Sequence, residues 1–288
     1  MRQYKDRACA KLNLYLGVSA QRADGYHDLC TVFQTIDVCD QVSVSVHDRG
    51  GISLKCNWPY LPTDGRNLAY RAAELFFAHS GKENPGIYIN IKKVIPVGAG
   101  MAGGSSNAAA VLRLLNRAFG YPLSKKELLA LGLQLGADVP FCLVGGTMLA
   151  EGVGEKLSPL PDMPACGIVV CKPNFSVATK KAYELFDAYA VQPEPGADAM
   201  KEALQQGDLQ GLCDGIFNSL EAPVAAQYPA IADLVQRLQS LGAMGARMTG
   251  SGAACFGIWT TVEEAEAAAE EMRKYCPTVF VTTPVKGV

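Results

Sequence analysis

The chain has 288 residues, of which 49% are hydrophobic and 19% are charged, and its formal net charge is −2 at pH 7. A chain of this length can bury one large hydrophobic core or two cores of typical size, and we expect two domains. The composition excludes a disordered chain and argues against a generally nucleic-acid-binding surface. No apolar run approaches the roughly 20 residues that span a bilayer, and the first residues lack a signal-like apolar core. We therefore expect a cytoplasmic protein that binds neither nucleic acid nor membrane.

The ten cysteines are spread along the chain from Cys9 to Cys276. They form no CxxC pair and have no histidines at the spacing of a zinc site. Many cysteines in a small secreted chain would indicate disulfides, but a chain of this length with scattered cysteines fits a reducing compartment. We expect free thiols.

Alternating apolar residues in the first third of the chain predict half-buried antiparallel strands. They are CAKLNLYLGV at residues 9–18, DQVSVSVHD at 40–48 and IYINIKK at 87–93. Between the last two, residues 67–81 have helical spacing, with Asn67 as the N-cap and Gly81 at the end.

Two helices are predicted next. SSNAAAVLRLLNRAFG, residues 105–120, is typical of a buried helix that ends at a glycine. SKKELLALGLQLG, residues 124–136, opens with the capping box from Ser124 to Glu127. Both helices should pack against the sheet.

A domain boundary is predicted near Ser158. The stretches CLVGGTMLAEG (142–152) and CGIVVCKP (166–173) favour strands, and the Pro-rich turn SPLPDMP lies between them. This places an N-terminal domain at residues 1–157 and a C-terminal domain at residues 158–288.

The last part of the chain alternates helices and strands. Helical spacing occurs at residues 180–190, 229–242 and 261–275, whereas residues 245–259 and 278–283 are strand-like. This order favours a mixed sheet with helices on one face, which is an α+β arrangement.

The stretch PVGAGMAGGSSNAAA, residues 96–110, places glycines between a strand-like run and a helix. Such a turn presents free backbone N–H groups and the positive end of a helix dipole to an anion, most commonly phosphate. Glycine permits positive φ and close approach of a ligand. A tight turn with a serine cap is the competing interpretation, but it needs fewer glycines.

The residues around the glycine stretch argue against several known classes of phosphate-binding loop. Gly98, Gly100 and Gly103 match the dinucleotide motif GxGxxG, but a predicted helix stands where that motif expects its second strand and acidic residue. No Gly-Lys-Ser/Thr follows, which excludes a P-loop, and the VAIK, HRD and DFG motifs of protein kinases are missing.

The glycine stretch resembles the ATP-binding motif of the galactokinase, homoserine kinase, mevalonate kinase and phosphomevalonate kinase (GHMP) superfamily. AKLNLYL followed by RADGYHDLCTVFQTID, then LGADVPFCLVGGT, and finally MTGSGAACFG resemble one branch of it. That branch phosphorylates a cytidine-diphosphate-linked methylerythritol in the non-mevalonate route to isoprenoids. The resemblance covers nearly the whole chain.

The resemblance implies an α+β fold of two domains with the active site in the cleft between them. The N-terminal domain would resemble the second domain of ribosomal protein S5, and the C-terminal domain would be a ferredoxin-like α/β sandwich. It implies ATP and Mg²⁺ as cofactors and a small-molecule acceptor. We expect a monomer or a homodimer.

The resemblance also implies roles for individual residues. Asp138 is the general base and Lys11 lies near it, which favours the ionised carboxylate and stabilises developing charge. The ATP loop comprises Pro96, Val97, Gly98, Ala99, Gly100, Met101, Ala102, Gly103, Gly104, Ser105, Ser106 and Asn107. The substrate-binding residues are Asn13, Tyr26, His27, Phe33, Thr179 and Tyr183, and the supporting glycine motif is Gly250, Ser251 and Gly252. The metal ligands are unknown, with Ser105 or Ser106 as candidates.

Several of these residues also have a structural interpretation. Asp138 before a proline is a good helix cap or turn residue, and Lys11 could protect a strand edge. Phe33 lies in an apolar run that favours core packing, and Thr179 and Tyr183 could be a cap and an amphipathic aromatic. The third glycine motif could be a plain hairpin turn.

The loop departs from the family at Ala99, Ala102 and Met101, where glycine, glycine and leucine are usual. Alanine is strained at positive φ, so these positions have ordinary dihedrals or the loop is under strain. The expected reaction is transfer of the γ-phosphoryl group of ATP to the 2-hydroxyl of the methylerythritol unit. Two alternatives remain open, which are a kinase for another small alcohol such as homoserine or mevalonate, and a non-catalytic nucleotide sensor.

Overall fold

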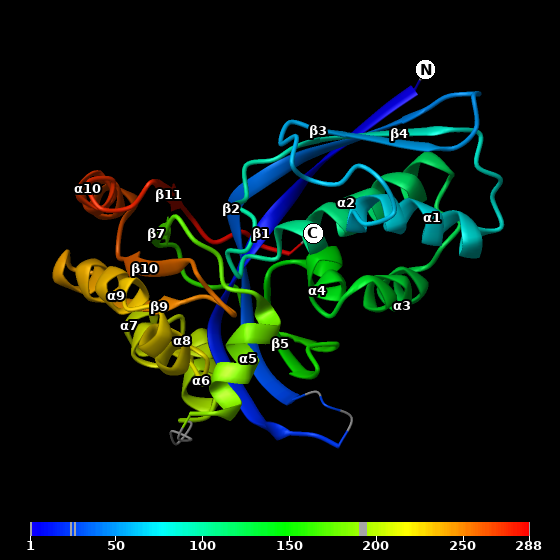
Figure 1. Cartoon of the computed structure of the whole chain (residues 1–288). Helices are drawn as coiled ribbons and strands as arrows, with labels where there is room; N and C mark the ends of the chain where they lie inside the picture. The colour runs from blue at the N-terminus through cyan, green and yellow to red at the C-terminus, as the bar shows by residue number, and fades with distance from the viewer. Residues whose placement is uncertain (1, 24, 26, 190–194, 288) are drawn as a thin grey trace.

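The computed structural model describes residues 2–287 apart from 24, 26 and 190–194 (Figure 1). The first half of the chain builds one sheet and the helices that cover it. Its elements are β1 (Arg2–Gln21), β2 (His27–Val46), β3 (Ile52–Cys56), α1 (Leu68–Ser80), β4 (Ile87–Lys92), α2 (Gly103–Ala118), α3 (Lys125–Leu135), α4 (Asp138–Val144), β5 (Thr147–Gly152) and β6 (Lys156–Pro159).

The second half builds a smaller sheet and adds one short strand, β8, to the first sheet. Its elements are β7 (Gly167–Lys172), α5 (Thr179–Asp187), α6 (Asp198–Gln206), α7 (Leu209–Asp214), β8 (Phe217–Asn218), α8 (Glu221–Gln227), α9 (Ala230–Ser240), β9 (Gly245–Met248), β10 (Cys255–Trp259), α10 (Val262–Met272) and β11 (Thr278–Thr282). Among the described helices, none is both long and apolar enough to cross a membrane.

The first sheet is organised around two long antiparallel strands, β1 and β2, which cross the whole molecule in Figure 1. The order β3-β4-β2-β1-β8 continues outwards from this pair, and β5 pairs with β2 and β6. Helices α1 to α4 form an apolar cluster with one face of the sheet. Alanines 108–110 of α2 are fully buried, and their small side chains let this helix lie close to β1.

Local signals predicted several elements correctly. In β4 the isoleucines at 87, 89 and 91 are buried while the residues between them are partly exposed, which confirms the alternation. Helix α1 begins after Asn67, whose side chain accepts from Ala69 N, and ends at Gly81 with φ 64°. The capping box from Ser124 to Glu127 is present at α3. These features need only neighbouring residues, so the sequence suffices to predict them.

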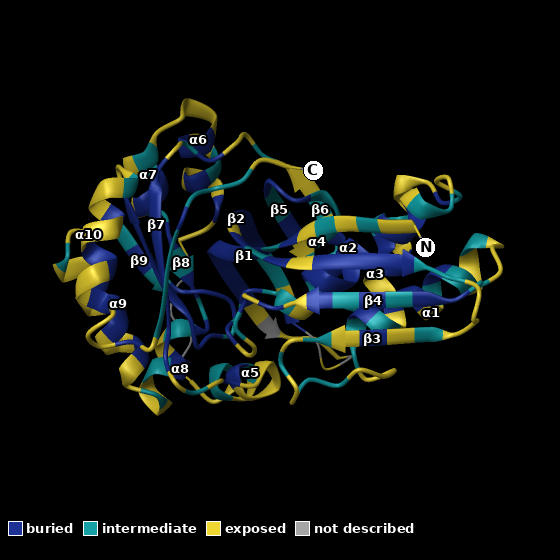
Figure 2. Ribbon diagram, turned by 90° about the horizontal axis from the view of Figure 1, so that it is seen from above, coloured by how far each residue is buried: buried dark blue, intermediate teal, exposed yellow. Residues whose placement is uncertain are grey.

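The second sheet has the order β11-β7-β10-β9, and α9 and α10 cover its outer face. Its inner face packs against β1 and β2 in a shared core that includes Leu12, Ile168 and Phe256. Figure 2 shows β7 as buried along its length, whereas α9 and α10 have exposed residues on their outer sides. Strand β7 is buried on both faces, which explains the continuous apolar run GIVVC instead of an alternation.

The structure corrects two expectations about the elements. Helix α2 begins at Gly103, two residues before the predicted start, because the loop itself turns into the helix. Residues 142–144 end helix α4 and are not a strand. The predicted boundary at 157/158 falls inside β6, which pairs with β5 of the first sheet. The division of the chain at that point stays a prediction.

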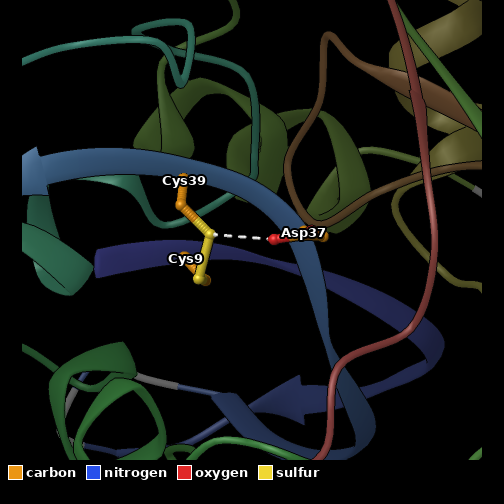
Figure 3. Close-up of side chains that lie close together, drawn as sticks. All are labelled: Cys9, Asp37 and Cys39. Carbon is orange, nitrogen blue, oxygen red and sulfur yellow. Dashed lines mark hydrogen bonds between the residues drawn. A yellow bond between two sulfur atoms is a disulfide. The ribbon is translucent and has the colours of Figure 1, made fainter. Parts of the chain in front are cut away.

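The expectation of free thiols is wrong at one place. Cys9 and Cys39 face each other across β1 and β2 and form a disulfide, with Asp37 beside Cys39 (Figure 3). The remaining eight cysteines are free thiols. The two partners are 30 residues apart, and only the strand register brings them together.

Candidate active site

A cavity of about 920 Å³ collects residues from all four sequence motifs. It lies where the glycine loop, the β1–β2 pair, α4, α5 and the turn after β9 meet. Of the predicted site residues, Tyr26 lies outside the described residues, and Ser106 is buried behind the wall. The others line the cavity: Lys11, Asn13, His27, Phe33, Pro96, Val97, Gly98, Ala99, Gly100, Met101, Ala102, Gly103, Gly104, Ser105, Asn107, Asp138, Thr179, Tyr183, Gly250, Ser251 and Gly252.

The glycine loop turns sharply before it enters α2. Gly98 and Gly100 have φ of 61° and 72°, and Ala102, the N-cap of α2, has φ 56°. Ala99 is not among the described residues with positive φ. The sequence left open whether these two alanines have ordinary dihedrals or are strained. Ala102 adopts the left-handed conformation, and Ala99 does not. The free N–H groups at the start of α2 lie on the cavity wall.

Replacing each alanine by glycine should separate these two conformations. We expect Ala102→Gly to keep or slightly raise the free energy of unfolding, because relief of a left-handed alanine offsets the entropy that glycine adds to the unfolded chain. Ala99→Gly should lower the free energy of unfolding by about 1 kcal/mol, because glycine adds entropy to the unfolded chain and a buried methyl group is lost. No left-handed strain is relieved at this position to offset these costs. Urea unfolding of both variants measures the difference, and equal losses would contradict it.

The third glycine motif holds the loop from behind. Ala254 N donates to Ala99 O at 3.3 Å, and a Cβ on Gly100 would overlap the carbonyl oxygen of Thr249. Asn218 in β8 fixes this turn, because its Nδ2 donates to Met248 O at 2.7 Å and to Gly250 O at 3.0 Å. The motif is thus more than a hairpin turn. Asn218 could not be found from the sequence, since no motif surrounds it.

Lys11 and Asn13 lie side by side on β1, beneath the third motif. The Lys11 ammonium donates to Asn13 Oδ1 and lies 5.2 Å from the centre of the Phe33 ring. Asn13 is held on its other sides, since its backbone N donates to Thr249 Oγ1 at 3.0 Å and its Nδ2 donates to Thr31 Oγ1 at 2.8 Å. The side-chain amide is therefore fixed in one orientation.

Asp138 begins α4 and lines the same cavity as Lys11. Burial lowers the pKa of Lys11, and the negative charge of Asp138 opposes that shift. Asp138 makes no direct ion pair with Lys11 within the described structure, and both residues line the same cavity. Ala137, not Asp138, is the N-cap of α4, and it makes no side-chain cap hydrogen bond. The cap interpretation of Asp138 is thus not supported.

Phe33 has a packing role as well as a place on the wall. Its ring packs against Phe141 at 4.8 Å between centroids, in a small cluster with Ala150. The ring also presents its face to Lys11, which favours the ammonium ion electrostatically. A role in stacking on a base stays a prediction.

The buried carboxylate of Asp40, which the sequence analysis did not single out, links the chain just before the glycine loop to α2. Asp40 is fully buried, and its carboxylate accepts from Lys93 Nζ, from Asn107 Nδ2 at 2.7 Å, and from the backbone N–H groups of Val94 at 2.6 Å and Ile95 at 2.9 Å. Lys93 Nζ also donates to Asn107 Oδ1 at 3.1 Å. In the sequence, Asp40 stands directly before an alternating strand, but this position does not show which residues its carboxylate contacts.

We expect Asp40→Asn to lower the free energy of unfolding by about 3–5 kcal/mol, because it leaves the buried Lys93 ammonium without its counter-ion. Asp40→Asn with Lys93→Met should recover part of that loss, since both charges are then absent. Denaturant unfolding of the single and double variants tests this. A double variant less stable than Asp40→Asn alone would contradict the expected recovery.

The serines at the start of α2 differ in their surroundings. Ser105 lines the cavity, whereas Ser106 is buried and its Oγ has no hydrogen-bond partner among the described residues. A buried hydroxyl without a partner is costly, and it is the kind of group that a bound ligand satisfies.

The far end of the cavity is formed by α5 and the end of the β1–β2 hairpin. Thr179 Oγ1 lies 3.2 Å from Ser251 Oγ, which connects the first residue of α5 to the third glycine motif. Tyr183, one helical turn later, stacks near His27 at 5.0 Å between ring centres. Burial, together with the charge of Asp138, raises the pKa of Tyr183 to about 12. The Tyr183 hydroxyl therefore stays protonated at neutral pH.

Comparison with known proteins agrees with this geometry. Residues 67–146 match the GHMP kinases N terminal domain, and residues 200–278 match the GHMP kinases C terminal domain. The chain is therefore a GHMP kinase, a small-molecule kinase with a mixed α+β fold of two domains.

The chain belongs to the family of 4-diphosphocytidyl-2-C-methyl-D-erythritol kinases. It is 41% identical to the enzyme of that name from Caldicellulosiruptor saccharolyticus, over 96% of this chain and 95% of the relative. It is 42% identical to that from Clostridium botulinum, over 97% and 99%. A crystal structure of a 4-(cytidine 5′-diphospho)-2C-methyl-D-erythritol kinase superposes with a TM-score of 0.84 at 37% identity, covering 98% of this chain and 99% of the other.

Proposed function

We propose that this protein transfers the γ-phosphoryl group of ATP to the 2-hydroxyl of 4-diphosphocytidyl-2-C-methyl-D-erythritol, with the 2-phosphate and ADP as products. The observation that carries the proposal is a single cavity that joins the N-terminus of α2 to Lys11 and Asp138. A helix N-terminus binds phosphate, and a carboxylate with a nearby ammonium suits an acceptor hydroxyl. This deepens the family assignment to a specific reaction.

In the proposed mechanism, Asp138 accepts the proton of the acceptor hydroxyl while the hydroxyl oxygen forms a bond to the γ-phosphorus of ATP. The bond from that phosphorus to the bridging oxygen breaks, and its electron pair leaves on ADP. Lys11 supports this step electrostatically, because a buried ammonium faces little solvent screening. Asn13, fixed by Thr249 and Thr31, orients the acceptor through its side-chain amide.

The glycine loop fits a nucleotide triphosphate. Gly98 and Gly100 turn where a Cβ would overlap Ser176 or Thr249, so the loop can take this path only without side chains at these two positions. When bound, ATP supplies the phosphoryl group and Mg²⁺ offsets its charge. Ser105, which lines the cavity, and Ser106, whose Oγ has no partner within the described chain, are the candidate metal or phosphate ligands.

Most Mg²⁺ ligands in this proposal come from the nucleotide and water. The group of His, Cys, Asp and Glu residues that lies close enough together to hold a metal, among those described, is Cys9, Asp37 and Cys39. None of these three lines the cavity, and the two sulfurs are bonded to each other. They therefore have no part in the proposed reaction.

The acceptor would lie towards α5, with Thr179, Tyr183, His27 and Phe33 along its path. We place the reaction in the cytoplasm, where ATP is available, and propose a monomer or homodimer.

The direct test incubates the protein with Mg-ATP and 4-diphosphocytidyl-methylerythritol and follows ³¹P signals. A new phosphomonoester that appears with ADP is the expected result. The same incubation with homoserine and with mevalonate is the control for acceptor choice. Phosphorylation of either alcohol in preference to the cytidine compound would overturn the proposal, and so would ATP binding without ADP formation from any of the three.

A further inference from the structure

One face of α5 encloses the imidazole ring of His27, at the start of β2. Tyr183 lies at 5.0 Å between ring centres, Phe186 meets the ring edge-to-face at 5.9 Å, and Asp187 Oδ1 lies 2.8 Å from His27 Nε2. These three residues are at positions i, i+3 and i+4, so they share one helical face. His27 is only 7% exposed, yet it is part of the cavity wall. Its ring is therefore held in one orientation.

The contact with Asp187 determines which nitrogen of His27 carries the proton. An ionised carboxylate only accepts hydrogen bonds, so Nε2 must be the donor. In the neutral ring the other nitrogen, Nδ1, is then an acceptor. Within the described part of the chain, Nδ1 has no hydrogen-bond partner. His27 lines the cavity, so Nδ1 is the ring nitrogen that is left to accept a hydrogen bond from a ligand.

We propose that Asp187 is a positioning residue that makes the site select cytosine over uracil through His27. The inference rests on the proposed function, in which the acceptor carries a cytidine diphosphate. Cytosine has an amino group at C4, which donates a hydrogen bond, whereas uracil has a carbonyl oxygen there, which accepts one. The Nδ1 lone pair matches the cytosine amino group and repels the uracil oxygen.

The position of Asp187, and not its charge, distinguishes it from its neighbour Glu184. Glu184 is on the same helix and reaches the same cavity, but its carboxylate lies 3.8 Å from Lys181 Nζ and 4.0 Å from Lys180 Nζ. Among the described residues, no hydrogen bond or ion pair joins it to His27. Glu184→Gln is therefore a matched control, because it removes a carboxylate charge from α5 without affecting the His27 tautomer.

The test compares kcat/KM for 4-diphosphocytidyl-methylerythritol with that for its uridine-diphosphate analogue. We expect the unmodified protein to prefer the cytidine compound by at least about 10²-fold, as a site built around a specific hydrogen bond does. In Asp187→Asn the amide can accept from Nε2–H or donate to Nε2, so both tautomers become accessible. The preference should then fall at least about tenfold, through KM, while kcat for the cytidine compound stays within about threefold.

A purely structural role of Asp187 would lower the activity with both compounds alike. An unchanged preference in Asp187→Asn overturns the inference, as does an equal loss of preference in Glu184→Gln. If neither compound is phosphorylated by the unmodified protein, the proposed function fails instead. The ¹⁵N spectrum of the imidazole rings then still tests the inference.

The chain has three histidines, so each imidazole can be assigned from the signals lost in His27→Gln and in the corresponding variants of the others. The expected spectrum shows His27 protonated at Nε2 in the unmodified protein and in Glu184→Gln, and a mixture of tautomers in Asp187→Asn. A His27 ring protonated at Nδ1 in the unmodified protein overturns the inference whether or not the kinase reaction is seen.

Discussion

Asp138→Asn should lower kcat by about 10²-fold or more, because the amide cannot accept the proton of the acceptor hydroxyl. The Kd for ATP should stay nearly unchanged, since the proposed phosphate contacts come from the glycine loop and α2 and not from Asp138. Folding should be little affected, because the Asp138 side chain does not cap α4. Steady-state assays with both substrates, together with ATP titration of the variant, measure the two effects separately.

The matched control is Asp198→Asn. Asp198 is the first residue of α6, as Asp138 is of α4, so the change removes the same charge from the same helical position away from the cavity. Its turnover should stay within about twofold, as expected for an exposed surface residue. Full turnover by Asp138→Asn would show that another group takes the proton.

Gly100→Ala should reduce kcat/KM for ATP by at least about 10²-fold. A Cβ there would overlap the carbonyl oxygen of Thr249, and that oxygen belongs to the backbone and cannot rotate away. The φ of 72° adds strain for any residue with a Cβ. The glycine loop and the third glycine motif must therefore move apart, and displacements of about 1 Å near reacting groups cost this much activity.

Gly81→Ala is the control that separates backbone strain at positive φ from steric overlap of the added Cβ. Gly81 ends α1 with φ 64°, and a Cβ there would meet no atom within 4 Å. That variant should lose about 1 kcal/mol of unfolding free energy and keep its activity. Thermal unfolding and ADP release measure both variants. Normal ATP use by Gly100→Ala would mean that the two glycine motifs need not touch.

The sequence predicted much of the local structure. Asn67, Gly81 and the pair Ser124–Glu127 define helix ends through contacts with residues at most four positions away. The isoleucines of β4 predicted its buried face. The glycines of the loop predicted a sharp turn into α2, and Gly98 and Gly100 do have positive φ there. Each of these signals is short in range.

Other features depended on residues far apart in the chain. The pairing of Cys9 with Cys39 follows from the register of two 20-residue strands, and a shift by one residue would turn the two side chains to opposite faces. The enclosure of Asp40 by Lys93 and Asn107 likewise joins three elements. No local pattern encodes such partners.

By itself, the sequence determined the helices α1, α2, α3, α5, α9 and α10 and the alternating strand β4, because backbone preferences and caps act between near neighbours. Only the tertiary structure decided that Lys11 and Asp138 line one cavity and that Asp187 contacts His27 across 160 residues. It also decided that Ala102 and not Ala99 adopts the left-handed conformation. These outcomes follow from strand pairing and core packing, which join segments that have no local influence on one another.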